Sequence, residues 1–298
     1  MVIRNWLSAF RLRTLPLALS CIGMGGFLAA VAGKFDSLIF FLCCLTTIFL
    51  QVLSNLANDY GDSIHGADHA ARKGPIRSVQ SGAISSGQMK NAVIFFVVLS
   101  LASGISLLLV SLGWDMKALS LFFGLGIVSI IAAIAYTVGK KPYGYSGLGD
   151  IAVLIFFGLV GVMGSLYLFT QRIFWIDILP ALSCGFFSIA VLNINNIRDI
   201  ESDKIAGKFS IPVRIGKKNA SRYHWFLLIA GMGSSIVYIL LNFQSAIQFM
   251  FLLTVPLFII NARAVSSKPS EELDPYLKQM AVSTLLFVIL FGFGMLIA

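Results

Sequence analysis

Nine apolar stretches, each long enough to cross a lipid bilayer as a helix, set the fold class of this chain. A transmembrane helix needs about 20 residues to span a hydrocarbon core of roughly 30 Å. With 58% hydrophobic and only 12% charged residues, the chain has too little polar surface to coat a water-soluble globule. The stretches cover residues 14–32, 37–57, 91–112, 116–137, 149–170, 174–196, 221–241, 245–264 and 279–298.

The chemistry of the backbone favours helices over strands in these stretches. Every backbone N–H and C=O group in lipid needs a partner within the protein, which only helices and closed barrels provide. The stretches lack the period-two alternation of an outer-membrane strand. The sequence therefore predicts an all-α, polytopic membrane protein with nine transmembrane helices in a bundle, forming a single domain over residues 1–298.

The positions of the cations predict the orientation of the bundle. If the N-terminus and every second connection share one side, that side carries all of the 22 lysines and arginines except Lys34, Lys117 and Arg172. Cytoplasmic loops are enriched in such cations. We therefore expect a cytoplasmic N-terminus and an outside C-terminus in the inner (cytoplasmic) membrane of the cell. The net charge of +9 then reflects topology, and we expect no nucleic-acid partner.

Two polar segments follow the second and sixth apolar stretches. The first motif, residues 55–78, contains NDYGDSIHGADHAARKGPIRS, and the second motif, residues 193–218, is NINNIRDIESDKIAGKFSIPVRIGKK. Side chains four residues apart share a helix face, as Asn58 and Asp62 do in the first motif and Asp199 and Asp203 in the second. A glycine and several cations follow each cluster. The repetition predicts a pseudo-repeat with a duplicated site on the cytoplasmic face.

Clustered carboxylates at the end of a membrane helix repel one another unless a cation lies among them. Mg²⁺ takes oxygen ligands and commonly binds through carboxylates together with a substrate's phosphates. Nearby arginines and lysines make charge-assisted contacts to a diphosphate. The pattern predicts a magnesium-diphosphate site; the alternative for either cluster alone is a solvated helix end with internal ion pairs. The candidate metal ligands are Asn58, Asp59, Asp62, Asp68, Asp199 and Asp203.

These two motifs resemble those of the intramembrane aromatic prenyltransferases of the UbiA superfamily. The details NDYxDxxxGxD, RxGPxR, NNxRDxxxDxxAGK, RTLP and LDPYLKQ resemble the branch that prenylates 1,4-dihydroxy-2-naphthoate for menaquinone synthesis. The superfamily pattern NxxxDxxxD is interrupted in the first motif, where Gly66 takes the third position and Asp68 is the next acid. The resemblance implies Mg²⁺-dependent transfer of a polyprenyl group from its diphosphate to an aromatic acceptor, with decarboxylation. 4-Hydroxybenzoate is the alternative acceptor.

The resemblance also assigns expected roles to individual residues. The stretch YTVGKKPYGYSGLGD matches the family's YxxxK spacing at Tyr136 and Lys140. We expect Asn58, Asp62, Asp199 and Asp203 to be catalytic. The expected diphosphate contacts are Arg72, Lys73, Arg77, Lys140, Arg198 and Lys208, and the acceptor or cavity contacts are Tyr60, Tyr136, Asn195 and Asn196.

Other classes explain these features less completely. A transporter with duplicated ion sites usually binds its ions near the bilayer midplane, whereas both motifs here lie at one face. A structural membrane scaffold leaves the acidic clusters without a cause. Asp62, His65 and His69 have the spacing of a zinc or iron site, but nothing elsewhere in the chain completes a nitrogen-rich shell.

Overall fold

The computed structural model describes residues 2–64 and 77–298 of the chain. Within these residues the protein is helical and contains no strand. Nine of the helical segments are long and apolar enough to cross a membrane, which confirms the predicted fold class and number of spans. The protein is therefore a multi-pass membrane protein.

The helical segments follow one another along the chain with short connections, apart from the two motif regions. In order they are α1 (Val2–Phe10), η1 (Leu12–Thr14), α2 (Leu15–Val31), α3 (Ser37–Ile64), α4 (Ser86–Leu112), α5 (Met116–Ala135), η2 (Tyr143–Ser146), α6 (Gly149–Val153), η3 (Leu154–Gly164), α7 (Ser165–Thr170), η4 (Trp175–Asp177), α8 (Ile178–Arg198), α9 (Ile200–Ile205), α10 (Ile211–Leu241), η5 (Ala246–Thr254), α11 (Val255–Ser267), η6 (Ser270–Glu272) and α12 (Asp274–Ile297).

Several helices extend beyond their apolar stretches because polar residues continue the same helical turns. The second span, α3, continues into the first motif as far as Ile64, whereas α10 begins at Ile211 but is kinked at Gly216, whose φ of 75° is not helical. Gly61 therefore lies inside α3. A Cβ atom at Gly61 would lie 2.6 Å from the carbonyl oxygen of Thr137. Glycine is needed there because α3 and the chain after α5 approach so closely.

Two features of the helices were not predicted. A short amphipathic helix, α1, precedes the first span; it exposes Ile3 and Leu7 and buries Ala9. The fifth span contains η3, an 11-residue stretch of π-helix between α6 and α7. Wide π-turns are rare and occur mainly near functional sites. This one lines the main cavity of the bundle, as described below.

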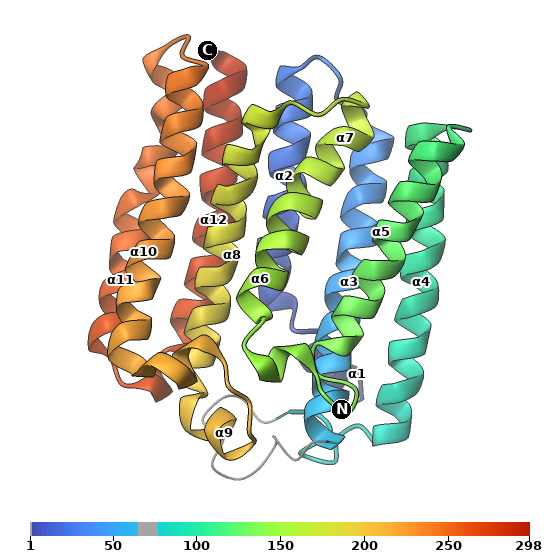
Figure 1. Cartoon of the computed structure of the whole chain (residues 1–298), viewed down its shortest axis with the longest axis vertical. Helices are drawn as coiled ribbons and strands as arrows, with labels where there is room; N and C mark the ends of the chain where they lie inside the picture. Colours follow the sequence, from blue (N-terminus) through green and yellow to red (C-terminus); the bar gives the residue numbers. More distant parts are fainter. Residues whose placement is uncertain (1, 65–76) are drawn as a thin grey trace.

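The helices stand side by side and the two ends of the chain lie at opposite ends of the bundle (Figure 1). The N-terminus, the last turn of α3 and α9 all lie at the same end. Both acidic motifs therefore reach one end of the bundle, as the spacing of the spans predicted. A large core cluster joins α2, α8, α10 and α12, and a smaller one joins α1, α3 and α4.

Candidate active site

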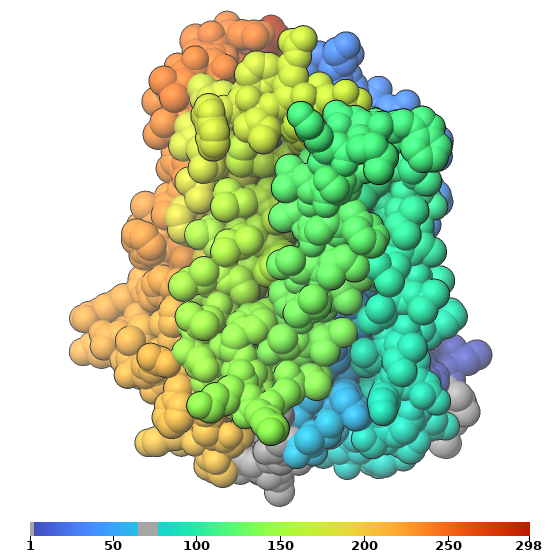
Figure 2. Space-filling view, turned by 45° about the vertical axis from the view of Figure 1, so that its right-hand side comes forward, coloured from blue at the N-terminus to red at the C-terminus, as the bar shows by residue number. Residues whose placement is uncertain are grey.

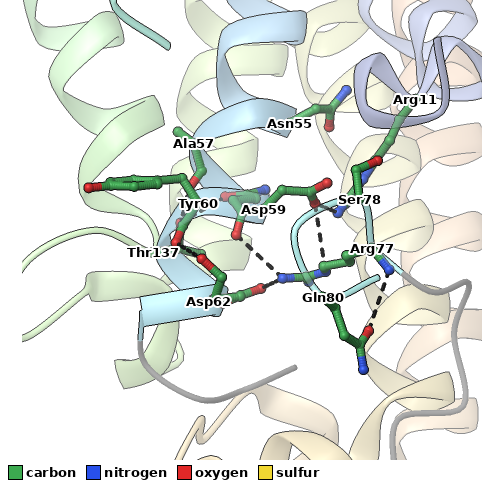
Figure 3. A network of polar contacts seen from close by, with 12 residues as sticks. Arg11, Asn55, Ala57, Asp59, Tyr60, Asp62, Arg77, Ser78, Gln80 and Thr137 are labelled. Carbon is green, nitrogen blue, oxygen red and sulfur yellow. Dashed lines mark hydrogen bonds and ion pairs between the residues drawn. The ribbon is translucent and has the colours of Figure 1, made fainter. Parts of the chain in front are cut away.

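The first motif is folded around the side chain of Arg77. Asp59 and Asp62, in the last turns of α3, are each only 2% exposed. Arg77 lies between them: its Nη1 donates to Asp62 Oδ2, and its Nε is 3.7 Å from Asp59 Oδ1 (Figure 3). The same guanidinium donates to the backbone oxygen of Asn58 over 3.3 Å. One arginine thus neutralises and orients two buried carboxylates.

Arg11 reaches the first motif from the other side. Its Nη2 donates to Asp59 Oδ1, so Asp59 lies between two guanidinium groups (Figure 3). The backbone of Arg11 is left-handed, with φ 49° and ψ 53°. A non-glycine residue rarely adopts this conformation, which is typical of chain reversals and functional sites. Here it ends α1 and directs the side chain toward α3.

Tyr145 connects the first motif to the second. Its hydroxyl donates to Asp62 Oδ1 over 2.8 Å, and its backbone oxygen accepts a hydrogen bond from Phe209 N over 2.9 Å. Burial raises the pKa of Tyr145 above its ordinary value, and the neighbouring Asp62 raises it further. The hydroxyl therefore remains protonated and acts as a donor.

The second motif is organised by Arg198, which is 2% exposed at the end of α8. Its Nε and Nη2 donate to the two oxygens of Asp199 over 2.9 and 2.7 Å. Nη2 also donates to Asn195 Oδ1 over 2.8 Å, and Nη1 to Asp274 Oδ1 over 2.6 Å. Such a bidentate pair fixes the orientation of the carboxylate as well as neutralising it.

Asp203 and Lys208 form the other charged pair of the second motif. A turn at Gly207, with φ 71°, brings Lys208 N to the backbone oxygen of Asp203 at 2.8 Å. Lys208 Nζ lies 3.4 Å from Asp203 Oδ2, and both residues are buried. Burial raises the pKa of Asp203 to about 6; Lys208 opposes this rise, while Asp199 and Asp62 add to it. Burial would lower the pKa of Lys208, but Asp203 holds it above the ordinary value.

The two motifs meet at one end of a single cavity of about 410 Å³. The first motif contributes Asn58, Asp62 and Arg77 to its walls, and the second contributes Asn195 and Lys208. The electrostatic influence of Asp62 on Asp203 agrees with this proximity. Both motifs therefore reach the same cavity, although the carboxylates Asp199 and Asp203 are not among the residues that line it.

The rest of the cavity is mostly apolar, with scattered serines and threonines, and extends along the bundle. Leu108 of α4, Phe122 of α5, Phe156 of η3 and Leu168 of α7 line it far from the charged end. Figure 2 shows the face on which α5 and the stretch from α6 to α7 lie next to each other. An apolar wall of this kind suits a hydrocarbon chain whose charged head is held among the two motifs.

The predicted site residues fall into distinct environments. Tyr136 lines the cavity, whereas Lys140 is exposed and does not. Tyr60 packs against the smaller core cluster and points away from Asp62 (Figure 3). Asn196 is 2% exposed. Asp68, Arg72 and Lys73, together with the histidines of the alternative metal site, lie outside the described residues.

Three residues that contact the charged residues of the site were not predicted from the sequence. Arg11 contacts Asp59, Tyr145 contacts Asp62, and Asp274 contacts Arg198. Asp274 lies in the LDPYLKQ stretch and Tyr145 in the YGYSGLGD stretch, and both stretches stood out in the sequence. Their proximity to the motifs depends on how distant helices pack, which spacing along the chain does not encode.

The residues present fit a divalent metal only after rearrangement of their ion pairs. Across residues 2–64 and 77–298, no three His, Cys, Asp or Glu side chains form a ready-made metal cluster. Asp203 Oδ2 and Asn196 Oδ1 are buried and accept no hydrogen bond from the described part of the chain. These oxygens are hard ligands of the kind Mg²⁺ prefers. The donor set therefore fits magnesium, with Arg77, Arg198 and Lys208 as the cations that balance the carboxylates.

Sequence comparison yields relatives over almost the whole chain. A 1,4-dihydroxy-2-naphthoate octaprenyltransferase of Haemophilus influenzae is 46% identical over 299 residues, which are 99% of this chain and 96% of the relative. The protein of the same description in Escherichia coli is 44% identical over 297 residues, 98% of this chain and 95% of the relative.

Structural comparison gives the same fold. A UbiA homolog from Archaeoglobus fulgidus bound to GPP and Mg²⁺ superposes with a TM-score of 0.64 at 18% identity, covering 99% of this chain and 100% of that one. A UbiA homolog from Aeropyrum pernix gives 0.66 at 19% identity, covering 96% and 97%. The UbiA prenyltransferase family profile matches residues 18–285. Nine membrane-spanning helices, two converging acidic motifs and these similarities together establish that the chain belongs to the UbiA prenyltransferase family.

Proposed function

We propose that this prenyltransferase moves a polyprenyl group from an allylic diphosphate to 1,4-dihydroxy-2-naphthoate, with loss of CO₂, to give demethylmenaquinol, the reduced form of demethylmenaquinone. The observation that carries the proposal is the convergence of both acidic motifs on the charged end of one otherwise apolar cavity. The acceptor follows from the two relatives that are 46% and 44% identical over nearly the whole chain.

The diphosphate occupies the charged end of the cavity in this proposal. Asn58 and Asp62 from the first motif, and Asp199 and Asp203 from the second, would hold Mg²⁺, which would supply positive charge to the departing diphosphate. The description of the Archaeoglobus fulgidus homolog as bound to GPP and Mg²⁺ supports this assignment.

The cations of the site complete the binding of the diphosphate. Arg77 and Lys208 line the cavity and contact the oxygens of the diphosphate in this proposal. Arg72 and Lys73 remain diphosphate contacts expected from the sequence alone. Arg198 is engaged by Asp199, Asn195 and Asp274, so it acts by orienting Asp199. Asp59 orients Arg11 and Arg77 in the same way.

The chain stabilises the charge that develops during transfer. As the C1–O bond breaks, its electron pair leaves with the diphosphate, whose oxygens receive hydrogen bonds from Arg77 and Lys208. The electron-rich carbon that bears the acceptor's carboxylate attacks C1. Loss of that carboxylate as CO₂ returns its electron pair to the ring and restores aromaticity. The apolar walls exclude water, which would otherwise capture the allylic cation.

The ring of Tyr136 is the strongest candidate for contact with the acceptor. It lines the cavity, as do Asn195 and Lys208 of the second motif. Burial raises the pKa of Tyr136 above its ordinary value, so the phenol is neutral and its ring face can stabilise a nearby cation. Tyr60 and Asn196 do not line the cavity and act indirectly in this assignment.

The active site faces the cytoplasm in this proposal, and the protein lies in the inner (cytoplasmic) membrane as one domain. The N-terminus and both motifs share one end of the bundle, and the chain's C-terminus lies at the other. Almost all cations belong to the connections at the first of these ends. The excess of positive charge supports an inside location for that end.

The test is a transfer assay on the purified full chain. Radiolabelled polyprenyl diphosphate is incubated with Mg²⁺ and either 1,4-dihydroxy-2-naphthoate or 4-hydroxybenzoate, and both the labelled product and released CO₂ are measured. We expect CO₂ and prenylated naphthoquinol with the naphthoate and little product with the benzoate. Product with 4-hydroxybenzoate alone would contradict the assignment of the naphthoate as acceptor. Passage of intact diphosphate across liposome membranes without prenyl transfer would favour a transporter.

A further inference from the structure

The segment between α1 and α2 contacts the first acidic motif directly and the second through one intervening side chain, Asp274. Its four residues, Arg11-Leu12-Arg13-Thr14, are here called the RLRT segment. Arg11 donates to Asp59 of the first motif. Arg13 Nη1 donates to Asp274 Oδ2 over 2.5 Å, and Asp274 Oδ1 accepts from Arg198 Nη1 of the second motif over 2.6 Å. Each motif is therefore within two side-chain contacts of the same four residues.

The RLRT segment is also fixed to α3 by neutral hydrogen bonds. Asn55 lies one helical turn before Asp59 and donates to the backbone oxygen of Phe10 over 2.9 Å. Gln51, a further turn back, donates to Thr14 Oγ1 over 3.3 Å. Thr14 Oγ1 in turn donates to the backbone oxygen of Arg11 over 2.9 Å. The left-handed backbone at Arg11 is thus held by contacts on both sides, which is how a strained conformation persists.

Asp274 links the RLRT segment to Arg198 of the second motif. It is the first residue of α12, and its two oxygens accept from two different arginines on two other spans. Arg198 already donates to both oxygens of Asp199 and to Asn195, so Asp274 supplies the remaining acceptor of a guanidinium that is almost fully buried. Without Asp274, one end of that guanidinium has no acceptor among these contacts and can turn away from Asp199.

We propose that Asp274, acting with the RLRT segment, is a positioning residue that couples the two acidic motifs and holds Asp199 in the orientation that metal binding requires. This rests on the function proposed above. The acid touches neither diphosphate nor acceptor; it acts through Arg198. Outer partners that orient metal ligands in this way typically affect metal affinity or activity by 10- to 100-fold when they are replaced.

A positioning role and a purely stabilising role for Asp274 predict different results. The side chains of Arg13 and Asp274 are 29% and 33% exposed, so their ion pair is partly solvated and contributes little to folding. The buried Arg198 keeps its contacts to Asp199 and Asn195 when Asp274 is replaced, so its charge still has acceptors. Replacing Asp274 should therefore change metal dependence much more than it changes thermal stability. If Asp274 only stabilised the fold, its replacement would change thermal stability more than metal dependence.

The experiment uses the full chain purified in detergent, with the variants Asp274→Asn, Arg13→Gln and the double variant. Two quantities are measured: the Mg²⁺ concentration that gives half-maximal transfer, and the shift in Tm produced by Mg²⁺ with polyprenyl diphosphate in the absence of acceptor. Glu272→Gln is the matched control, because this exposed acid is two residues away and pairs only with Lys268 among the contacts described.

For Asp274→Asn we expect a 10- to 100-fold higher Mg²⁺ requirement and loss of the ligand-induced Tm shift at the Mg²⁺ concentration that saturates the parent protein. Arg13→Gln should move both quantities in the same direction, and the double variant should be no worse than Asp274→Asn, since both changes break one chain of contacts. Arg13→Gln also serves if Asp274→Asn does not fold. Glu272→Gln should match the parent.

Two outcomes would overturn the inference while leaving the proposed function intact. One is a parent-like Mg²⁺ titration and Tm shift in both single variants. The other is multiplicative losses in the double variant, which would mean that Arg13 and Asp274 act separately. Absence of Mg²⁺-dependent transfer in the parent protein would instead contradict the proposed function, and this inference with it.

Discussion

Tyr145 donates its hydroxyl hydrogen to Asp62 over 2.8 Å and so joins the connection between α5 and α6 to the first acidic motif. The backbone of the same tyrosine accepts from Phe209, just after Lys208 of the second motif. Arg214 strengthens this junction by donating to the backbone oxygens of Ser146 and Phe209, over 2.8 and 2.9 Å. The connection between α5 and α6 therefore joins the two motifs of the site to each other.

Replacing Tyr145 with Phe should lower kcat about 10-fold, because Asp62 loses a donor that fixes its orientation while the ring and its packing remain. Steady-state kinetics at saturating substrates measures the effect. Tyr238→Phe is the control, since Tyr238 makes the same kind of bond to Asp177 over 3.2 Å at the other end of the bundle. Equal kcat values for the two variants would refute a special role for Tyr145.

Two lysines that the sequence placed near the site should differ in their effect on diphosphate binding. Lys208 is 5% exposed and lines the cavity, whereas Lys140 is exposed outside it. Lys208→Gln should raise the KM for polyprenyl diphosphate at least 10-fold, since a charge-assisted contact is lost and Asp203 is left without its partner.

Lys140→Gln serves as the comparison for that measurement and should change KM by less than about threefold, as expected for a solvated lysine. Initial rates over a range of diphosphate concentrations give both values. A larger effect at Lys140 than at Lys208 would assign the YxxxK lysine to the diphosphate and contradict the assignment of Lys208.

Because α3 lies so close to the chain after α5, adding a side chain at Gly61 should lower the stability of the protein. A Cβ there would lie 2.6 Å from both the backbone and the side-chain oxygen of Thr137. Gly61→Ala should destabilise the protein by about 1–3 kcal/mol through overpacking and displace the neighbouring Asp62. Thermal unfolding in detergent and the transfer assay measure the two effects.

Gly87, in the first turn of α4, is the matched control for that substitution. Nothing lies within 4 Å of a Cβ built at this position. Gly87→Ala should keep full activity and leave Tm unchanged or slightly higher, because alanine favours the helix. If the two alanine variants unfold at the same temperature, the contact between Gly61 and Thr137 does not constrain the fold.

The sequence predicted the architecture well because lipid leaves so few options. Length and hydropathy were sufficient for nine helical spans, and the i,i+4 spacing of Asn58 and Asp62 predicted their shared face because α3 continues to Ile64. The start of α10 at Ile211 was missed, since residues 211–220 are too polar to read as part of a span.

The partners within the site were harder to predict, because they depend on contacts between distant segments. Arg198 was expected at the diphosphate but donates to Asp199, Asn195 and Asp274. The contact with Asp274 joins residues 76 positions apart. A count of charges along the chain identifies the cations of the site, but it does not distinguish a cation that faces the cavity from one that orients a carboxylate.

The central claim is that the two motifs act on one diphosphate, and equilibrium binding tests it most directly. Radiolabelled polyprenyl diphosphate is titrated against the full chain without acceptor, with Mg²⁺ or with EDTA, for the parent, Asp62→Asn and Asp203→Asn. The account predicts binding that EDTA abolishes, and a loss of affinity of about 100-fold in each variant, since each removes a ligand from a shared site. Parent-like, Mg²⁺-dependent binding in either variant would contradict it.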